Sequence, residues 1–415
     1  MAKKPNSSKL KKELGLFDVF ALATGSTLAG GFFLLPGIAA ASVGSALPFA
    51  YLIAALFLLP GLLAKAELAT AMPRSGGVYF FLDRSMGPLW GTMSGFGTYF
   101  SLILKTSFAL VGVGAYLGLF FPNLQIKTVA VGLAIVFGVV NLLGAKKTGA
   151  AQGVLVIGLL LLLAWFSGLG LFNIEMSHFS ELMATPSGSL ISTAGLVIVS
   201  YMGLTKVASV AGEVKNPERN LPLGMFLAYI TAILVYMIGT TVMIGVVGVD
   251  TLSLNGGDLT PVATTADVLV GNWGKVLMTI AAVLAFASVG NSGILSASRY
   301  PMAMSNDRLL PDFMSRLTKK TSSPWASIIL TVGIVVLFVT VLNPIKIAKL
   351  ASSFQLLMFA MSTVAVIVMR EAKLDSYDPG FKSPFYPWLQ IVGIIASLWM
   401  IFQMGYLSVS FTVGM

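Results

Sequence analysis

Long apolar runs, one after another, constrain this chain more than any other feature of its sequence. A helix needs about 20 apolar residues to cross a hydrocarbon layer of about 30 Å, and eleven runs of that kind follow one another with short polar breaks. Only 10% of the 415 residues are charged, against roughly 25% in an average soluble domain. A soluble globule of this composition would expose large apolar surface to water. The pattern therefore predicts an all-α, polytopic membrane protein.

The expected membrane spans are distributed along the whole chain. They cover residues 16–40, 45–70, 87–121, 126–145, 150–172, 188–212, 222–248, 272–303, 324–342, 347–369 and 388–413. If the Lys-rich head 1–15 is cytoplasmic and the spans alternate, 21 of the 26 Lys and Arg residues fall on the cytoplasmic side and four on the other side. This positive-inside bias predicts a multi-pass protein of the plasma (cell inner) membrane with a cytoplasmic N-terminus.

Composition excludes most other classes of function. The chain has no Cys and a single His, so it lacks parts for a thiolate metal site or for Ser-His chemistry. It contains no zinc-type HExxH motif, no GxSxG nucleophile elbow and no phosphate-binding loop. The net charge of +10 comes from short basic clusters between apolar runs rather than from a basic face for nucleic acid. We therefore expect no enzyme, no metal site built from Cys or His ligands, no cofactor other than a possible coupling ion, H+ or Na+, and no nucleic-acid partner.

Two spans carry interruptions at matching places. Ala23 to Phe33 places adjacent glycines, Gly30 and Gly31, at mid-membrane before Pro36, and the sixth span has small residues from Ser200 to Thr205. Unwound backbone survives in lipid only where it lines a cavity or is buried in protein. Paired interrupted helices mark the midplane site of many secondary transporters built from inverted repeats.

This pattern predicts a five-plus-five inverted-repeat bundle with helices 1 and 6 interrupted. The expected parts are a cytoplasmic segment 1–15, a first repeat 16–173, a second repeat 188–369 and an eleventh helix within 388–415. Freed N–H groups bind a carboxylate and freed carbonyls bind an ammonium group or a cation, which together suit an amino-acid zwitterion. A packing kink is the alternative explanation for either interruption.

Four stretches resemble signatures of a known family. They are Gly25–Phe33, Glu67–Tyr79, Gly212–Pro222 and Ile294–Pro311. In these stretches and in its span pattern the chain resembles the amino acid-polyamine-organocation (APC) superfamily of permeases, which has the LeuT-type fold. The resemblance implies alternating-access transport of amino acids or related amines. Family members usually have twelve helices, so helix 12 is expected to be absent here.

The resemblance also implies a set of substrate-binding residues. These are Thr27, Ala29, Gly30, Gly31, Lys105, Val199, Met202, Gly203 and Thr205. The substrate carboxylate would meet the backbone at Thr27, Gly30 and Gly31, and the amino group would face the backbone around Val199 and Met202. Ala29 stands where the family usually has Gly, Val199 where many members have an aromatic residue, and Thr205 where Glu is frequent. Loss of that carboxylate disfavours cationic substrates, so neutral amino acids are the expected substrates. The alternative function is an amino-acid or amine exchanger, and a membrane channel or receptor is less favoured.

Charged and hydroxyl residues within the spans suggest further roles. Lys105, near the middle of the third span, is expected in the substrate cavity as a charge partner or a titrating group; snorkelling or pairing with carbonyls is the alternative. Ser288 and Ser292 are candidates for a coupling sodium ion, although interhelical hydrogen bonds explain them equally well. Lys206 and Glu213, seven residues apart, are candidates for an inner gate or for interfacial charges. Coupling to H+ or Na+ is left open, and no oligomeric state is predicted.

Overall fold

The chain is described by a computed structural model that covers residues 12, 14–73, 77–143, 149–180, 186–318, 321, 323–373 and 377–414. Across these residues it is helical, and its one β contact is an isolated bridge between Leu14 and Val214. The all-α prediction is confirmed. Most of the predicted N-terminal segment 1–15 lies outside the described residues.

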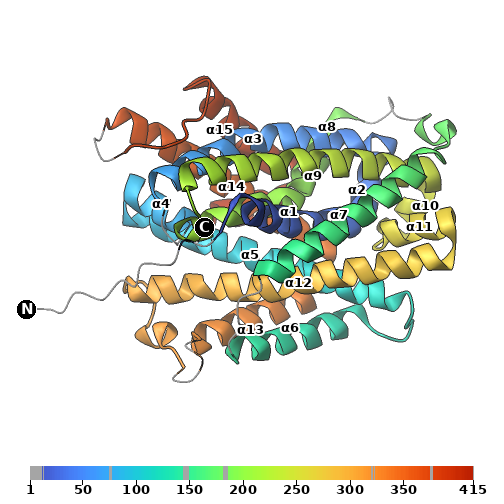
Figure 1. The fold of residues 1–415 in the computed structure, drawn as a ribbon, viewed down its shortest axis with the longest axis horizontal. Helices are drawn as coiled ribbons and strands as arrows, with labels where there is room; N and C mark the ends of the chain where they lie inside the picture. Colours follow the sequence, from blue (N-terminus) through green and yellow to red (C-terminus); the bar gives the residue numbers. More distant parts are fainter. Residues whose placement is uncertain are drawn as a thin grey trace, which may run out of the picture.

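The helices follow the chain in a simple order (Figure 1). They are α1 (Leu16–Phe33), α2 (Leu35–Val43), η1 (Gly44–Ala46), α3 (Leu47–Ala71), α4 (Gly77–Met86), α5 (Pro88–Gly118), α6 (Ile126–Leu142), α7 (Gly149–Leu171), η2 (Met176–Phe179), α8 (Ser187–Tyr201), η4 (Met202–Glu213), α9 (Pro217–Val247), α10 (Val249–Ser253), η5 (Leu254–Gly256), α11 (Pro261–Val270), α12 (Asn272–Asn306), η6 (Asp312–Ser315), α13 (Trp325–Val341), α14 (Pro344–Glu371), α15 (Trp388–Gln403) and α16 (Tyr406–Val413).

Helix lengths agree with the predicted spans. Among the described residues, eight helical segments are long and apolar enough to cross a membrane. The shorter apolar helices α6, α13 and α15 correspond to the other three predicted spans. Large apolar side chains remain exposed along the bundle, as expected where lipid rather than water is the neighbour.

The first interruption lies further along the chain than the glycine pair suggests. α1 continues through Gly30 and Gly31 to Phe33, and the break falls at Leu34. Pro36 explains this position, because in a continuous helix its ring would clash with the carbonyl of Phe32 and leave that carbonyl without its N–H donor. The prediction of unwound backbone at the glycines is therefore wrong, although the first span is interrupted.

The second interruption lies where the sequence predicts it. α8 ends at Tyr201 and continues as the 3₁₀ helix η4 from Met202 to Glu213. The hydroxyl of Ser352 on α14 accepts a hydrogen bond from the Val199 N–H at 2.9 Å, so a side chain enters the helical ladder just before the break. Insertion of this kind is a common cause of helix distortion.

The last predicted span, 388–413, is two helices rather than one. α15 ends at Gln403, and Gly405 follows with a φ of 97°, a left-handed conformation that other residues rarely adopt. α15 has 16 residues, so at 1.5 Å per residue it is about 24 Å long, less than the hydrocarbon thickness.

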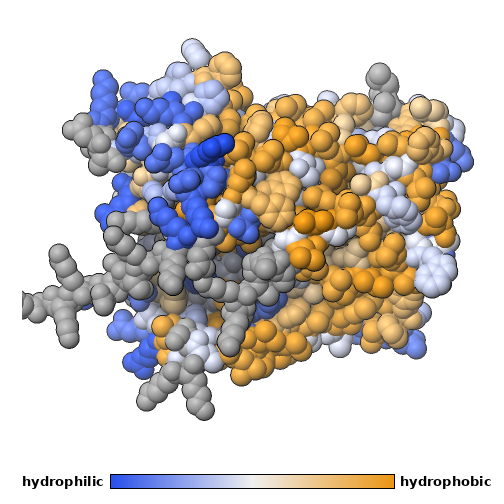
Figure 2. Space-filling model, in the orientation of Figure 1, coloured by the Kyte–Doolittle hydropathy of each residue, from blue (hydrophilic) through white to orange (hydrophobic). Residues whose placement is uncertain are grey.

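Helix α1 lies in the middle of the bundle, and α6 and α13 lie side by side at one edge (Figure 1). α1 packs against α5, α7, α8, α9, α12 and η4. Hydrophilic residues gather at the left end of the view, where Figure 1 places α4, and apolar residues cover most of the remaining surface in view (Figure 2).

Candidate functional site

A cavity of about 470 Å³, lined by apolar residues and by several polar and charged ones, lies inside the bundle. Its wall comes from α1, α3, α4, α5, η4, α12 and α14, and it extends from the middle of α5 towards the end that carries the basic residues. Six of the predicted residues line it: Lys105, Met202, Gly203, Thr205, Lys206 and Glu213. Thr27, Ala29, Gly30, Gly31, Val199, Ser288 and Ser292 are not part of its wall.

Lys105 projects from α5 into the cavity towards α1. Its Nζ donates a hydrogen bond to the carbonyl oxygen of Ser26 at 2.7 Å. This carbonyl faces the cavity one turn before the glycine pair. The ammonium group therefore lies against the central helix, and part of its hydrogen-bonding capacity remains for a bound molecule.

Lys206 extends from η4 to α12 at the same cavity. Its Nζ donates to Ser292 Oγ at 2.8 Å, so the hydroxyl proposed for a sodium ion carries an ammonium partner here. Ser288 lies about one turn earlier on α12.

Lys206 and Glu213 both line the cavity, but no ion pair joins them in the described part of the chain. Helix type gives a reason. In a 3₁₀ helix with three residues per turn, positions seven apart lie about a third of a turn off a common face. The single-face spacing expected for an α-helix therefore does not apply in η4.

The glycines of α1 serve close packing. A side-chain carbon on Gly31 would collide with Ser200 on α8 and with the hydroxyl of Tyr236 on α9. Tyr51 Oη donates to the Gly31 carbonyl at 2.8 Å, and Tyr236 Oη donates to the Thr27 carbonyl at 2.9 Å. Because Gly30 and Gly31 both lie within α1, their N–H groups are directed at carbonyls one turn back rather than at a ligand.

The start of η4 packs directly on α1. A Cβ on Gly203 would meet the backbone of Ser26 and Thr27. Thr205 Oγ1 accepts a 3.5 Å hydrogen bond from Gln355 Nε2 on α14. Gln355 lines the cavity too. The sequence alone does not indicate this, because an apolar run that contains one amide resembles an ordinary buried helix.

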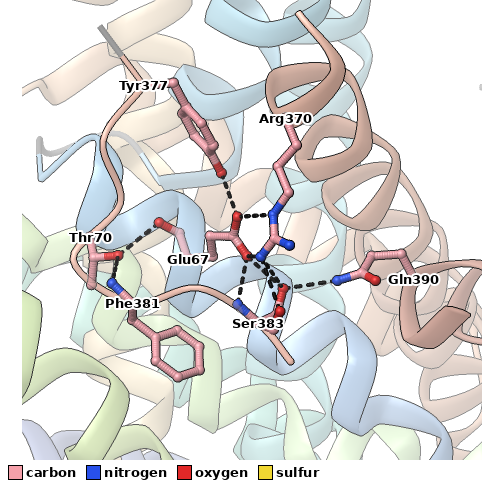
Figure 3. Close-up of polar contacts among 7 residues, drawn as sticks. All are labelled: Glu67, Thr70, Arg370, Tyr377, Phe381, Ser383 and Gln390. Atoms are coloured by element: carbon pink, nitrogen blue, oxygen red, sulfur yellow. Dashed lines mark hydrogen bonds and ion pairs between the residues drawn. The ribbon is translucent and has the colours of Figure 1, made fainter. Parts of the chain in front are cut away.

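Glu67, from one of the family-like stretches, lies outside the cavity in a buried polar cluster (Figure 3). Its Oε1 accepts from Arg370 Nε at 2.8 Å and from Tyr377 Oη at 2.9 Å. Its Oε2 accepts from Arg370 Nη2 at 2.7 Å and from the Ser383 N–H at 2.8 Å. Burial, together with the Glu67 charge, raises the pKa of Tyr377, so its hydroxyl remains a donor. The cluster joins α3 to the end of α14 and the segment that precedes α15.

At the opposite end of the bundle, the segment between α10 and α11 packs directly against α2. A Cβ on Gly37 of α2 would collide with the backbone carbonyl of Asp258. The Asp258 carboxylate accepts a hydrogen bond from the Thr260 N–H at 2.7 Å, which fixes the turn that precedes α11. Within residues 249–271, α10 and the segment around Asp258 therefore both lie on α2.

Membrane-length helices packed around an internal cavity are the architecture of a polytopic membrane protein. The chain matches the amino acid permease family over residues 14–414. It therefore belongs to that family, within the APC superfamily.

Three relatives from Bacillus subtilis (strain 168) align along nearly the whole chain. The branched-chain amino acid permease BcaP is 28% identical over 96% of this chain and 90% of its own length. The serine/threonine exchanger SteT is 25% identical over 94% of this chain and 91% of its own length. The aspartate-proton symporter is 25% identical over 97% of this chain and 81% of its own length. These similarities support an amino acid transporter.

Proposed function

We propose that this protein is a secondary active transporter that moves amino acids across the plasma membrane by alternating access, with its N-terminus in the cytoplasm. One observation supports the mechanism: the described cavity wall reaches from Lys105 to residues near the basic end of the bundle, such as Ala303, and includes no residue of α2, α10 or α11 at the other end, where Gly37 packs on Asp258. One access path open and one closed is the arrangement that alternating access requires. The 3₁₀ helix η4 forms part of the wall, and long 3₁₀ segments often mark hinges.

For the substrate, we propose an amino acid without a net positive charge. Lys105 and Lys206 face the cavity and repel cations, and Thr205 offers a hydroxyl where many family members have Glu. Neutral amino acids, the expectation from the sequence, satisfy this condition. The substrates named for the three Bacillus subtilis relatives, branched-chain amino acids, serine or threonine, and aspartate, satisfy it as well, whereas a relative from Arabidopsis thaliana is named a cationic amino acid transporter.

Uptake into proteoliposomes tests the proposal. Purified protein is reconstituted, and labelled amino acids are offered with an inward proton gradient, with an inward sodium gradient or with neither. Saturable uptake supports a transporter, and the gradient that drives it identifies the coupling ion. Counterflow against a preloaded amino acid, without net uptake, identifies the exchanger alternative. Absence of both from protein with a cooperative thermal transition overturns the proposal.

A further inference from the structure

The charges that face the cavity are strongly unbalanced. Four basic side chains line it, Lys65, Lys105, Lys206 and Arg299, against one acidic side chain, Glu213. Lys65 is 2% exposed to solvent, and its Nζ lies 4.3 Å from the centre of the Phe359 ring. A buried ammonium without an opposite charge is unfavourable in a protein interior.

No acidic side chain in the described part of the chain pairs with these basic groups. The ion pairs found there join His178 to Glu175, Lys275 to Asp267 and Arg370 to Glu67, all away from the cavity wall. Lys105 and Lys206 bond instead to uncharged oxygens, a carbonyl and a hydroxyl. The cavity therefore keeps an excess of positive charge that a bound anion would neutralise.

The donors that reach the cavity determine which anion fits. The N–H groups of Gly30 and Gly31 are used within α1, so the charged donors on the cavity wall are the four basic side chains. Of these, the ammonium groups of Lys105 and Lys206 are held in place by described hydrogen bonds. They come from different elements, α5 and η4, and each is anchored on a further helix, Lys105 on α1 and Lys206 on α12. Two separately held cations suit a ligand with two separate carboxylates better than one with a single carboxylate.

Building on the proposed transport of amino acids, we infer that the preferred substrate has net negative charge, an amino acid with a second carboxylate in its side chain. One carboxylate binds Lys105 and the other binds Lys206. The substrate ammonium then faces the uncharged side of the cavity, where Thr205 and Gln355 supply oxygen acceptors. A cavity of about 470 Å³ falls within the usual range for small-molecule sites and has room for such a molecule.

Selectivity of the unmodified protein in proteoliposomes tests this inference. Labelled aspartate and glutamate are compared with leucine and serine, each as substrate and as competitor. We expect the dicarboxylic pair to be transported with the lower KM and to inhibit uptake of the neutral pair. Transport of neutral amino acids without competition by aspartate or glutamate overturns the inference and leaves the proposed function intact. Absence of uptake and counterflow for every amino acid overturns both.

Two variants test the assignment of the carboxylates. Lys105→Gln and Lys206→Gln each remove one charged donor, and we expect the KM for the dicarboxylic substrate to rise about tenfold or more, in line with hydrogen bonds to charged groups. The KM for a neutral amino acid should change far less, and Lys105→Arg should restore part of the preference. Equal losses for both substrate types contradict the assignment.

Lys127→Gln is the matched control. Lys127 is on α6, away from the cavity, and its Nζ donates to the exposed Thr340 carbonyl at 2.7 Å. The Lys127→Gln substitution removes one positive charge, as the cavity variants do, so the transport kinetics of this variant should match those of the unmodified protein. If the cavity variants lack a cooperative thermal transition, the selectivity of the unmodified protein alone decides whether the preferred substrate is a dicarboxylic amino acid.

Discussion

At the scale of single residues, a buried carboxylate holds one end of the bundle together. Glu67 is fully buried and accepts hydrogen bonds from α14 and from the segment before α15, whereas the Arg370 side chain keeps 18% of its surface exposed. The carboxylate has enough donors around it to offset the loss of water. Glu67 therefore has a structural role in its family-like stretch and does not line the cavity.

Glu67→Gln should destabilise the fold. The amide cannot accept both guanidinium bonds, and breaking a buried ion pair costs about 3–5 kcal/mol because the remaining charge is left without its partner. We expect a lower midpoint of thermal unfolding in detergent. Glu371→Gln is the control, since Glu371 is exposed and accepts only from Tyr386 in the described contacts. Equal midpoints for the two variants would show that the cluster adds no stability.

Residue chemistry predicted part of the cavity. Lys105 could be placed in the cavity wall from sequence, because an ammonium group at mid-membrane needs a polar surrounding. The role of Gly31 could not be predicted from sequence, because glycine occurs both where a helix unwinds and where two helices pack closely. The residues that show close packing here, Ser200 and Tyr236, are far away in the chain.

At the scale of elements, apolar runs predicted the helices well and their breaks less well. The thickness of the hydrocarbon core sets the length of an apolar run, so helices can be recognised from these runs. A helix break depends instead on single residues such as Pro36 and Gly405 and on inserted side chains such as Ser352. The position of η4 depends further on its contact with α1, where Gly203 lies on the backbone of Thr27.

Gly203→Ala should push η4 away from α1. The added methyl group has no space against the Ser26–Thr27 backbone, and overpacking of this kind costs about 1–3 kcal/mol. We expect a lower thermal midpoint together with slower uptake, because η4 also carries Lys206. Gly132→Ala provides the comparison, since a Cβ there meets nothing within 4 Å. Wild-type uptake and stability in Gly203→Ala would exclude this packing as a constraint on η4.

At the scale of the whole molecule, we propose a cavity that is open at the basic end and closed at the α2 end. Solvent should therefore reach the cavity wall from the basic end, near Ala303 on α12, and be excluded from the α2–α11 end. The chain contains no Cys, so single cysteines can be introduced without removing native ones, and each reports access at one known position.

Ser296→Cys places a thiol in the cavity wall, and Thr251→Cys places one on the exposed surface of α10 at the opposite end. With a membrane-impermeant thiol reagent, we expect the first to be labelled in inside-out vesicles and the second in right-side-out vesicles. This result follows if the basic end faces the cytoplasm, as the positive-inside bias requires. Saturating substrate should slow labelling of Ser296→Cys, because the bound molecule fills the cavity, and leave Thr251→Cys unchanged. Labelling of both from one side would contradict the proposed orientation, and labelling of Ser296→Cys that substrate does not affect would separate this cavity from the transport path.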